Sequence, residues 1–453
     1  MGSANVDINL NTAASESALA GKWLRHWYRS PILLVLAWIC GLAWTVHWSV
    51  FLYRQSPPAF MDLDVYRLGV QAWWHGQDMY GPLPRTIAGI YLPFIYPPFA
   101  AAIFSPLAAL PWTPSAITML LLSMLSLAGV IYLTARRLWP EGGRRAALLC
   151  TGVALPLALH TQPVSDTLWF GQINLVLMAL VTVDCLVPHP KWPRGVLVGI
   201  AAAIKLTPAV FVLYFLLRKD YKATVTTVVS AVVATGLGFL ISPIGSVRYW
   251  FGSSGGARSI SGSTFYTNQT IDAALARLPG LAHEQTLLWL AGVVVVGVFA
   301  VIGIRRAHLL DSPVSAPLAM VLTGAFGLIA SPTSWGHHWV YEVPAIMVML
   351  AVAIRQRKIL WLIAAAGTAL VFWYAPFMHE SGHGPSLLAR AWYQIYSNGY
   401  TSLGILLLIL FAIPAVFRFR SREATTVPST APTVSTAAPT AEAPGTESKV
   451  RPA

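Results

Sequence analysis

The sequence predicts an all-α protein built as a polytopic transmembrane helix bundle. Hydrophobic residues make up 56% of the 453 residues and only 10% are charged, against roughly 25% charged residues in an average soluble domain. Apolar runs of about 17–25 residues, the length that crosses the hydrocarbon core of a bilayer, recur along the chain. Together these observations exclude an ordinary soluble protein.

The apolar runs indicate where the chain crosses the membrane. We expect spans near residues 31–53, 115–135, 146–160, 169–187, 222–243, 286–304, 313–330, 338–354, 359–377 and 399–417. The first run is longer than a signal-peptide core and has no small-residue cleavage site after it, so we expect it to stay as an anchor.

Two further apolar segments are interrupted. The segment from Phe94 to Pro111 is short and Pro-rich, and the segment 195–217 contains Lys205 and Pro208. A Lys and a Pro in the middle of a run are costly in lipid but are tolerated where a broken helix lines a cavity inside the protein. We interpret both segments as re-entrant or broken helices, which gives about ten to twelve transmembrane helices in all.

The charge distribution predicts the orientation. The chain has 30 Lys and Arg against 17 Asp and Glu, a formal net charge of +13. The basic residues form small groups between apolar runs, which is typical of cytoplasmic loops, and they do not gather on a polar face as in a nucleic-acid-binding domain. We therefore expect membrane lipids and no nucleic acid as partners, in a multi-pass plasma-membrane protein with both termini in the cytoplasm.

This topology divides the chain into three parts. Residues 1–30 form a cytoplasmic segment, residues 31–417 the transmembrane domain, and residues 418–453 a Thr/Pro/Ala-rich cytoplasmic tail that we expect to be disordered. Two long outer loops, 54–95 and 244–285, lie on the extracytoplasmic side. Loops of this length without low complexity are usually functional, so we expect the active site on that side.

The cysteines and the glycine-containing loops give no sign of a zinc site or a nucleotide site. Cys40, Cys150 and Cys185 lie in apolar segments without CxxC spacing or a Cys/His cluster, which favours buried thiols over a disulfide framework or a zinc site. The chain has no Walker loop and no GxGxxG loop.

Two carboxylates after the first span are candidates for a general base. Asp62 and Asp64 lie at the water–lipid boundary beside apolar residues such as Phe60 and Val65, and desolvation makes a carboxylate more basic. The alternative is that they cap a short helix or pair with Arg67.

The outer ends of other spans carry further polar residues. His337 and His338 are suited to phosphate binding, proton transfer or metal ligation, although with Trp335 they also fit an interfacial Trp/His belt. Lys205, inside an apolar run, indicates a functional site that needs an anionic partner such as a lipid phosphate. Gln162, Gln172 and Asn174 could serve a substrate or bond between helices. The second outer loop adds Arg258, Asn268 and Gln269.

In this order, these segments resemble glycosyltransferase family 87 of the GT-C class, the polyprenol-phosphate-mannose-dependent α-(1→2)-mannosyltransferases of actinobacteria. The resemblance spans about residues 31–417, with Thr270 and Tyr341 as small departures from the family pattern. The matching segments are Asp62-Leu63-x-Val65-Tyr66-Arg67, Leu92-Pro93-Phe94-x-Tyr96-Pro97-Pro98-Phe99-Ala100, Gly171-Gln172-Ile173-Asn174, Ala202-Ala203-Ile204-Lys205-Leu206-Thr207-Pro208, Asn268-Gln269-Thr270 and Ser331-Pro332-x-Ser334-Trp335-x-His337-His338-Trp339.

The resemblance implies an inverting transfer from a polyprenyl (decaprenyl) phosphate mannose donor to a mannosylated phosphatidylinositol lipid or a lipomannan or lipoarabinomannan acceptor. It also implies an Asp in the first outer loop as the base, which matches Asp62, with Asp64 as the alternate. The donor phosphate and sugar would then be bound by Lys205, His337, His338 and Arg258, and sugars oriented by Tyr66, Gln162, Gln172, Asn174, Asn268, Gln269 and Trp335. No cofactor is required, although Mg²⁺ or Mn²⁺ on Asp62 and Asp64 is left open.

Two other functions fit parts of the sequence. An arabinofuranosyltransferase that uses a decaprenyl-phosphate pentose would share the donor chemistry. A secondary transporter would also have an intramembrane Lys and broken helices. Such a transporter usually has related halves, and residues 31–217 and 222–417 show no similarity.

Overall fold

The computed structural model describes residues 30–54, 60–252, 264–278, 280, 283–374 and 387–414. Over these ranges the chain forms helices and no β-strand, which confirms the all-α prediction. Four helices have the length and apolar composition to cross a membrane: α2 (Pro31–Tyr53), α5 (Trp112–Leu138), α11 (Tyr221–Ile241) and α14 (Gln285–Leu309). The protein is therefore a polytopic membrane protein, and the count of ten to twelve spans stays a prediction.

Shorter helices complete the bundle. The shorter apolar segments are α4 (Pro98–Ala109), α8 (Asn174–Leu186), η2 (Thr207–Phe211) with α10 (Val212–Leu217), α15 (Ser315–Ala330), α17 (Ile359–Tyr374) and α19 (Gly399–Ala412). The other helices are α3 (Met61–Trp74), η1 (Pro140–Gly142), α6 (Gly143–Ala158), α7 (Gln162–Phe170), α9 (Val196–Ile204), α12 (Pro243–Phe251), α13 (Ile271–Ala276), η4 (Gly336–His338), α16 (Glu342–Gln356) and α18 (Leu387–Ser397).

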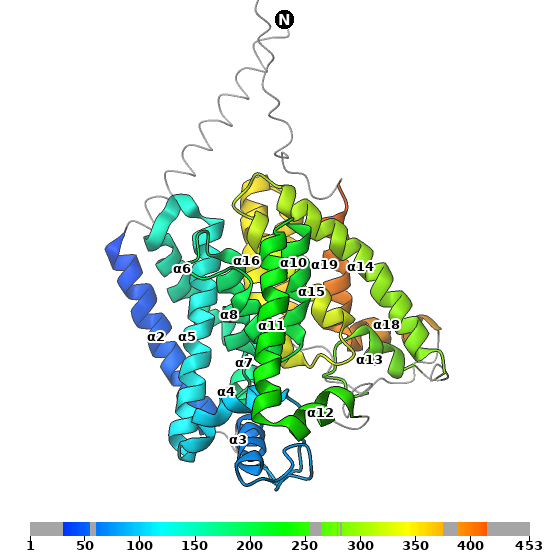
Figure 1. Ribbon diagram of the computed structural model, residues 1–453. Helices are drawn as coiled ribbons and strands as arrows, with labels where there is room; N and C mark the ends of the chain where they lie inside the picture. Colours follow the sequence, from blue (N-terminus) through cyan, green and yellow to red (C-terminus); the bar gives the residue numbers. More distant parts are fainter. Residues whose placement is uncertain are drawn as a thin grey trace, which may run out of the picture.

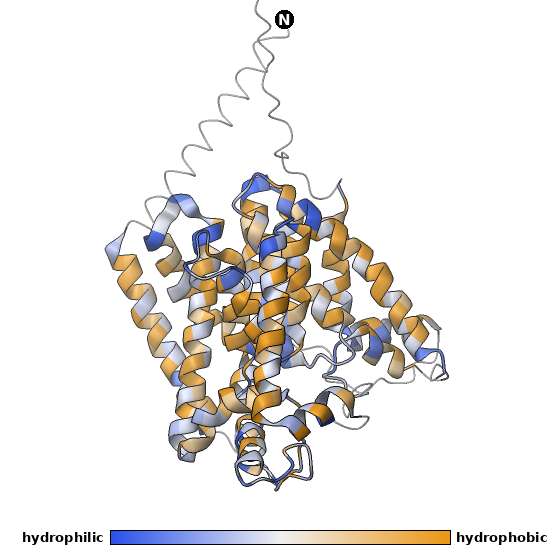
Figure 2. Cartoon of the chain, viewed as in Figure 1, coloured by the Kyte–Doolittle hydropathy of each residue, from blue (hydrophilic) through white to orange (hydrophobic). Residues whose placement is uncertain are grey.

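Polar residues gather at the two ends of the bundle. Figure 1 shows α3 and α12 together at one end of the long helices α5 and α11. Figure 2 shows hydrophobic residues along the length of these helices and hydrophilic residues mainly at their ends. This pattern is the one expected of helices surrounded by lipid.

The segment after α6 differs from the prediction. Residues 161–168 were expected to connect two spans, but α7 occupies them and makes a 76° bend with the preceding helix. The following span was expected near 169, but α8 begins at Asn174 because Gly171 leaves the helical conformation with φ of 68°. Glycine adopts a positive φ without steric cost, so α7 ends there.

The prediction of a broken helix at Lys205 is confirmed. Helix α9 ends at Ile204, Lys205 has extended backbone angles (φ −146°, ψ 129°), and the chain turns into η2 at Thr207. Pro208, which lacks a backbone N–H, lies in the first turn of η2, where that donor is not needed.

The two predicted outer loops contain helices. The first holds α3, whose Leu63, Val65, Tyr66 and Val70 are buried, and the second holds α12 and α13. Residues 1–29, Arg258 and the tail at 418–453 lie outside the described residues, so their predictions are not addressed by the structure.

At the end of the bundle opposite α3, arginines contact the last carbonyls of neighbouring helices. Arg305 Nη1 donates to Leu217 O at the end of α10 at 3.2 Å, and Arg355 Nη2 donates to Leu138 O at the end of α5 at 2.6 Å. These carbonyls lack partners within their own helices and carry the negative end of the helix dipole. The basic groups that indicate orientation therefore also hold helix ends together.

We predict that Gly41→Ala destabilises the fold, because a Cβ at Gly41 of α2 would lie 2.3 Å from Gly152 O of α6. The two helices must move apart, at a cost of about 1–3 kcal/mol. The control is Gly129→Ala in α5, where a Cβ has no atom within 4 Å and the helix gains up to about 1 kcal/mol. Thermal unfolding of the purified protein in detergent measures both. Equal unfolding midpoints would contradict the close contact.

Candidate functional site

The first turn of α3 is fixed by the corner between α7 and α8. The Phe60 N–H donates to Trp169 O at 2.6 Å. A Cβ at Gly171 would lie 2.9 Å from Leu63 Cβ, so the corner can approach α3 this closely only with glycine at that position. The start of α3, which carries Asp62, is therefore held against the α7–α8 corner.

Gln172 joins Asp62 to two tyrosines. Its Nε2 donates to Asp62 Oδ2 at 2.6 Å. Its Oε1 accepts from Tyr66 Oη at 2.8 Å and from Tyr96 Oη at 3.0 Å. Because an ionised carboxylate only accepts, the amide nitrogen must face Asp62, and the amide oxygen is left to accept from the two phenols. The carboxylate is thus held in one orientation by a buried hydrogen-bond network.

The environment of Asp62 makes it a stronger base than an exposed aspartate. Burial raises the pKa of Asp62 from its usual 3.8 to about 6, while the hydrogen bond from Gln172 and the charge of Lys205 lower it. Desolvation is the largest effect, because removing water disfavours the charged form. The group is mainly ionised at neutral pH and still accepts a proton readily.

Asp64 faces a different partner. Residues two apart on a helix point to different sides, and Asp64 Oδ2 accepts from the backbone N–H of Ile87 at 2.7 Å. Burial raises the pKa of Asp64, and this bond and the nearby Arg67 lower it. Arg67 itself donates to the backbone oxygen of Leu110 at 2.7 Å, at the end of α4. Asp64 therefore anchors the first outer loop on α3.

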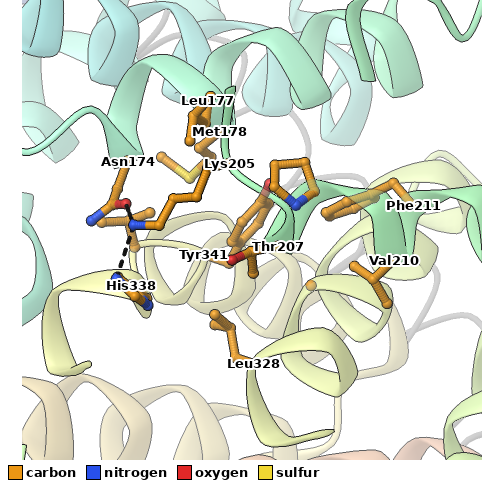
Figure 3. A pocket seen from close by; sticks show the side chains of 13 residues that line it. Asn174, Leu177, Met178, Lys205, Thr207, Val210, Phe211, Leu328, His338 and Tyr341 are labelled. Carbon is orange, nitrogen blue, oxygen red and sulfur yellow. Dashed lines mark hydrogen bonds between the residues drawn. The ribbon is translucent and has the colours of Figure 1, made fainter. Parts of the chain in front are cut away.

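Lys205 forms a second polar group. Its Nζ donates to Asn174 Oδ1 and to His338 Nε2, each at 2.9 Å, and Asn174 Nδ2 donates to His337 O at 2.8 Å. Figure 3 shows Lys205 between Asn174 and His338. The Lys205 ammonium lies 5.6 Å from the centre of the Tyr96 ring, a distance that allows a cation–π contact.

The two histidines are neutral partners of this lysine. His338 accepts on Nε2, and burial and the Lys205 charge hold the pKa of both His337 and His338 well below its usual value. His337 Nε2 and His338 Nδ1 are buried and have no hydrogen-bond partner among the described residues. Of the two, His338 lines the pocket described below.

The Gly171–Asn174 segment and Tyr96 bring the two polar groups together. Gln172 contacts Asp62 and Asn174 contacts Lys205. Tyr96 places its hydroxyl on Gln172 and its ring beside Lys205. The arrangement offers a base and a cation on neighbouring sides of one aromatic ring.

A pocket extends from Lys205 between apolar side chains. Figure 3 shows Lys205, Asn174 and His338 at one end, with Phe211 and Val210 at the other. The pocket is lined by Asn174, Leu177, Met178, Lys205, Thr207, Pro208, Val210, Phe211, Gly324, Leu328, His338, Val340 and Tyr341. A cationic end and an apolar body suit an anion joined to a hydrocarbon chain.

Asn268 and Gln269 hold loops together. Asn268 Oδ1 accepts from the Ser334 N–H at 2.9 Å. Gln269 Nε2 donates to the backbone oxygens of Tyr266 at 2.7 Å and Ser397 at 2.9 Å. Both side chains are fully buried. These bonds position the loop that carries the histidines and do not involve Asp62 or Lys205.

Trp335 and Gln162 also have other partners. Trp335 pairs with Asn268 through an isolated β-bridge and packs its ring near Phe265. Gln162 Nε2 donates to Asp166 Oδ1 one turn further along α7, at 2.6 Å.

Sequence reasoning did not select Tyr96 or Thr167 as site residues. Tyr96 lies in the Leu92–Ala100 segment. The prolines that follow it indicate a broken helix but give no sign of a role for the phenol. Thr167 Oγ1 donates to His337 O at 2.9 Å. Nothing in its spacing indicates this contact, because the two residues are far apart in the sequence.

The described residues contain no group of three or more His, Cys, Asp or Glu side chains that could hold a metal ion. Asp62 and Asp64, the pair considered for Mg²⁺ or Mn²⁺, have separate partners in Gln172 and Ile87. Lys205 is close enough to Asp62 for its charge to lower the pKa of that carboxyl.

Comparisons with known proteins identify relatives. Residues 94–332 match glycosyltransferase family 87. The chain is 37% identical over 409 residues to a polyprenol-phosphate-mannose-dependent alpha-(1-2)-phosphatidylinositol mannoside mannosyltransferase of Mycolicibacterium smegmatis, covering 86% of this chain and 91% of the relative. It is 38% identical over 356 residues to the protein of that name from Mycobacterium tuberculosis, covering 76% and 82%.

Another relative matches over only part of its length. An alpha-(1->3)-arabinofuranosyltransferase of Corynebacterium glutamicum is 31% identical over 134 residues, which is 29% of each chain. No solved structure matches the chain.

We predict that Asp62 gives a carboxyl infrared band that titrates near pH 6 and is missing in Asp62→Asn. In Gln172→Ala the band should titrate at a higher pH, because the lost hydrogen bond is one that lowers the pKa of Asp62. The control is Asp64→Asn, which should keep the band. An unchanged or lower titration pH in Gln172→Ala would contradict the network.

Proposed function

The chain belongs to glycosyltransferase family 87, and from this premise we propose that it transfers mannose from polyprenyl-phosphate mannose to a phosphatidylinositol mannoside, forming an α-(1→2) link. Relatives with that printed activity are 37–38% identical over most of the chain. The observation that carries the proposal is the pairing of a half-buried base, Asp62, with a half-buried cation, Lys205, through Gln172 and Tyr96.

Asp62 acts as the base on the acceptor. It removes the proton from the 2-hydroxyl of the acceptor mannose while that oxygen attacks the anomeric carbon of the donor. One bond forms between this oxygen and the anomeric carbon as the bond from that carbon to the phosphate oxygen breaks. Attack on the face opposite to the phosphate inverts the anomeric centre, as in inverting glycosidases.

Lys205 receives the leaving phosphate. Its ammonium, with His338 and Asn174 beside it, offsets the negative charge that develops as polyprenyl phosphate departs. Phosphate leaves without a proton, so one carboxylate is enough. The apolar side chains beyond Lys205 enclose a cavity of only about 40 Å³, so they must move apart to admit the first units of the prenyl chain. Arg258, as predicted from the sequence, adds a further contact to the phosphate.

Three finer features belong to the same proposal. The prenyl chain is decaprenyl, the site faces the extracytoplasmic side, and both termini lie in the cytoplasm. No metal takes part, because Lys205 already supplies a positive charge beside Asp62. The basic groups at the end of the bundle opposite α3 support this orientation.

An arabinofuranosyltransferase is the second candidate, favoured by the partial match to such an enzyme. That match covers 29% of the chain, against 86% for the mannosyltransferase. Mannose is therefore the proposed sugar.

We predict that Asp62→Asn lowers the transfer rate by about 10²–10⁴-fold, the usual contribution of a general base. Asp64→Asn keeps a side-chain oxygen that can accept from the Ile87 N–H, so the loop stays attached and most of the rate should remain. The assay supplies polyprenyl-phosphate mannose and a phosphatidylinositol mannoside to the purified protein, with and without EDTA, and maps the product linkage. Near-normal activity of Asp62→Asn would overturn the assignment, and inhibition by EDTA would overturn the metal-free mechanism.

We predict that Lys205→Met weakens donor binding about tenfold or more, because hydrogen bonds to a charged group contribute roughly 1.5–3 kcal/mol. The KM for the donor should rise and the KM for the acceptor should change little. Lys222→Met, at an exposed position at the start of α11, is the control. An unchanged donor KM in Lys205→Met would remove this residue from the phosphate site.

A further inference from the structure

Helix α12 begins where a membrane-spanning helix ends. Helix α11, which is long and apolar enough to cross the membrane, ends at Ile241, and α12 begins at Pro243 after the single residue Ser242. Figure 1 shows α12 running across the end of α11 instead of continuing its direction. The first residues of α12 must therefore lie at the boundary between lipid and water.

One face of α12 is apolar and unusually exposed. Ile244, Val247 and Phe251 are 87%, 55% and 75% exposed, and their spacing of three and four residues places them on one side of the helix. The same face lines an open hollow. Burying apolar side chains of this size away from water is favourable. A helix beside a bilayer obtains this gain by turning that face into the lipid.

The edge of this face and the remaining side of α12 pack on the first outer loop, and Arg248 also lines the hollow. Arg248 forms an ion pair with Asp78, and the rings of Tyr249 and Tyr80 lie 5.8 Å apart. Tyr80 Oη then donates to Tyr96 O at 2.7 Å. Tyr96 is the residue whose hydroxyl bonds to Gln172 beside Asp62. A continuous set of contacts therefore runs from α12 to the base.

We propose that α12 is an interfacial helix that docks on the outer lipid leaflet through Ile244, Val247 and Phe251 and anchors the first outer loop through the Arg248–Asp78 ion pair. The leaflet is the outer one if the orientation in the proposed function is correct. The occupant of the exposed face is bulk membrane lipid, because the face lies one residue beyond a spanning helix. Anchoring this loop preserves the hydrogen bond from Tyr80 Oη to Tyr96 O. Tyr96 then stays in place to bond Gln172 beside Asp62.

The ion pair is suited to this role at a membrane surface. Both partners are partly exposed, 44% for Arg248 and 38% for Asp78, and in water such a pair contributes little. Next to lipid the effective dielectric constant is lower, so the attraction is stronger. The aliphatic part of the Arg248 side chain can lie along the apolar face while its charged end reaches Asp78.

The lipid contact is tested by spin labels in proteoliposomes. Cys40, Cys150 and Cys185 are replaced by Ala, and labels are placed one at a time through Ile244→Cys, Phe251→Cys and His75→Cys. Accessibility to oxygen, which concentrates in lipid, is compared with accessibility to a water-soluble nickel chelate. The labels at 244 and 251 should favour oxygen and the label at 75, on the exposed end of α3, should favour nickel. Labels at 244 and 251 that behave like the one at 75 would overturn the docking.

The anchoring is tested by charge reversal. Asp78→Arg and Arg248→Asp should each increase the mobility of a label at Tyr91→Cys, in the first outer loop, and lower the transfer kcat by about threefold to tenfold at an unchanged donor KM. The double reversal should restore most of both values, because it re-forms the ion pair but not the bond that Asp78 Oδ1 accepts from the Tyr80 N–H at 2.9 Å. The control is Glu141→Arg, which breaks the ion pair with Arg355 beside the end of α5. It should change neither the label mobility nor the kcat.

The readouts separate this inference from the proposed function. Accessibility and label mobility need no substrate, so they judge the inference even if the protein transfers no mannose. A double reversal no better than the single ones, or single reversals with a rigid loop and full kcat, would overturn the anchoring. A misfolded single variant is recognised by its lower thermal unfolding midpoint. In that case the accessibility of the labels at 244 and 251 decides whether α12 docks on the membrane.

Discussion

The break between α7 and α8 is the constraint on which the site depends. Gly171, with φ of 68°, ends α7 and lets the chain change direction, and the Gln172 N–H closes the turn on Thr167 O at 2.9 Å. Two amides only two residues apart then reach segments from different parts of the chain: Gln172 reaches Asp62 and Asn174 reaches Lys205. The second break, after α9, supplies Lys205. Broken helices are acceptable in a membrane protein when the freed polar groups satisfy one another.

The two amides also explain why the site is rigid before a substrate binds. Gln172 accepts on its oxygen from two phenols and donates its nitrogen to Asp62. Asn174 accepts from Lys205 and donates to His337 O. Turning Gln172 over would place its oxygen against the Asp62 carboxylate, and turning Asn174 over would place its nitrogen against the Lys205 ammonium. A polar group left unsatisfied in this way costs about 1–3 kcal/mol. The orientation of the base and of the cation is therefore set in advance, which is the arrangement that favours electrostatic catalysis.

Hydropathy and single unusual residues predicted much of this structure. The long spans followed from apolar runs, and the broken helix followed from Lys205 and Pro208. Helix α7 was missed because its Gln162, Pro163 and Asp166 resemble a connecting loop in a hydropathy profile. The roles of the amides were not predictable for a different reason. Residue type and spacing select Gln172 and Gln269 equally, and only tertiary contacts place one on Asp62 and the other on Ser397.

The neutral partners of Lys205 link donor binding to the strength of the base. Among the described residues Lys205 has no carboxylate within ion-pair distance, and Asn174 and His338 hold its ammonium without cancelling its charge. In the free protein part of that charge lowers the pKa of Asp62. If the donor phosphate binds Lys205 as proposed, it offsets this charge and raises the pKa of Asp62. Asp62 is then most basic when a sugar is present to be attacked, and a carboxylate partner for Lys205 would have removed this coupling.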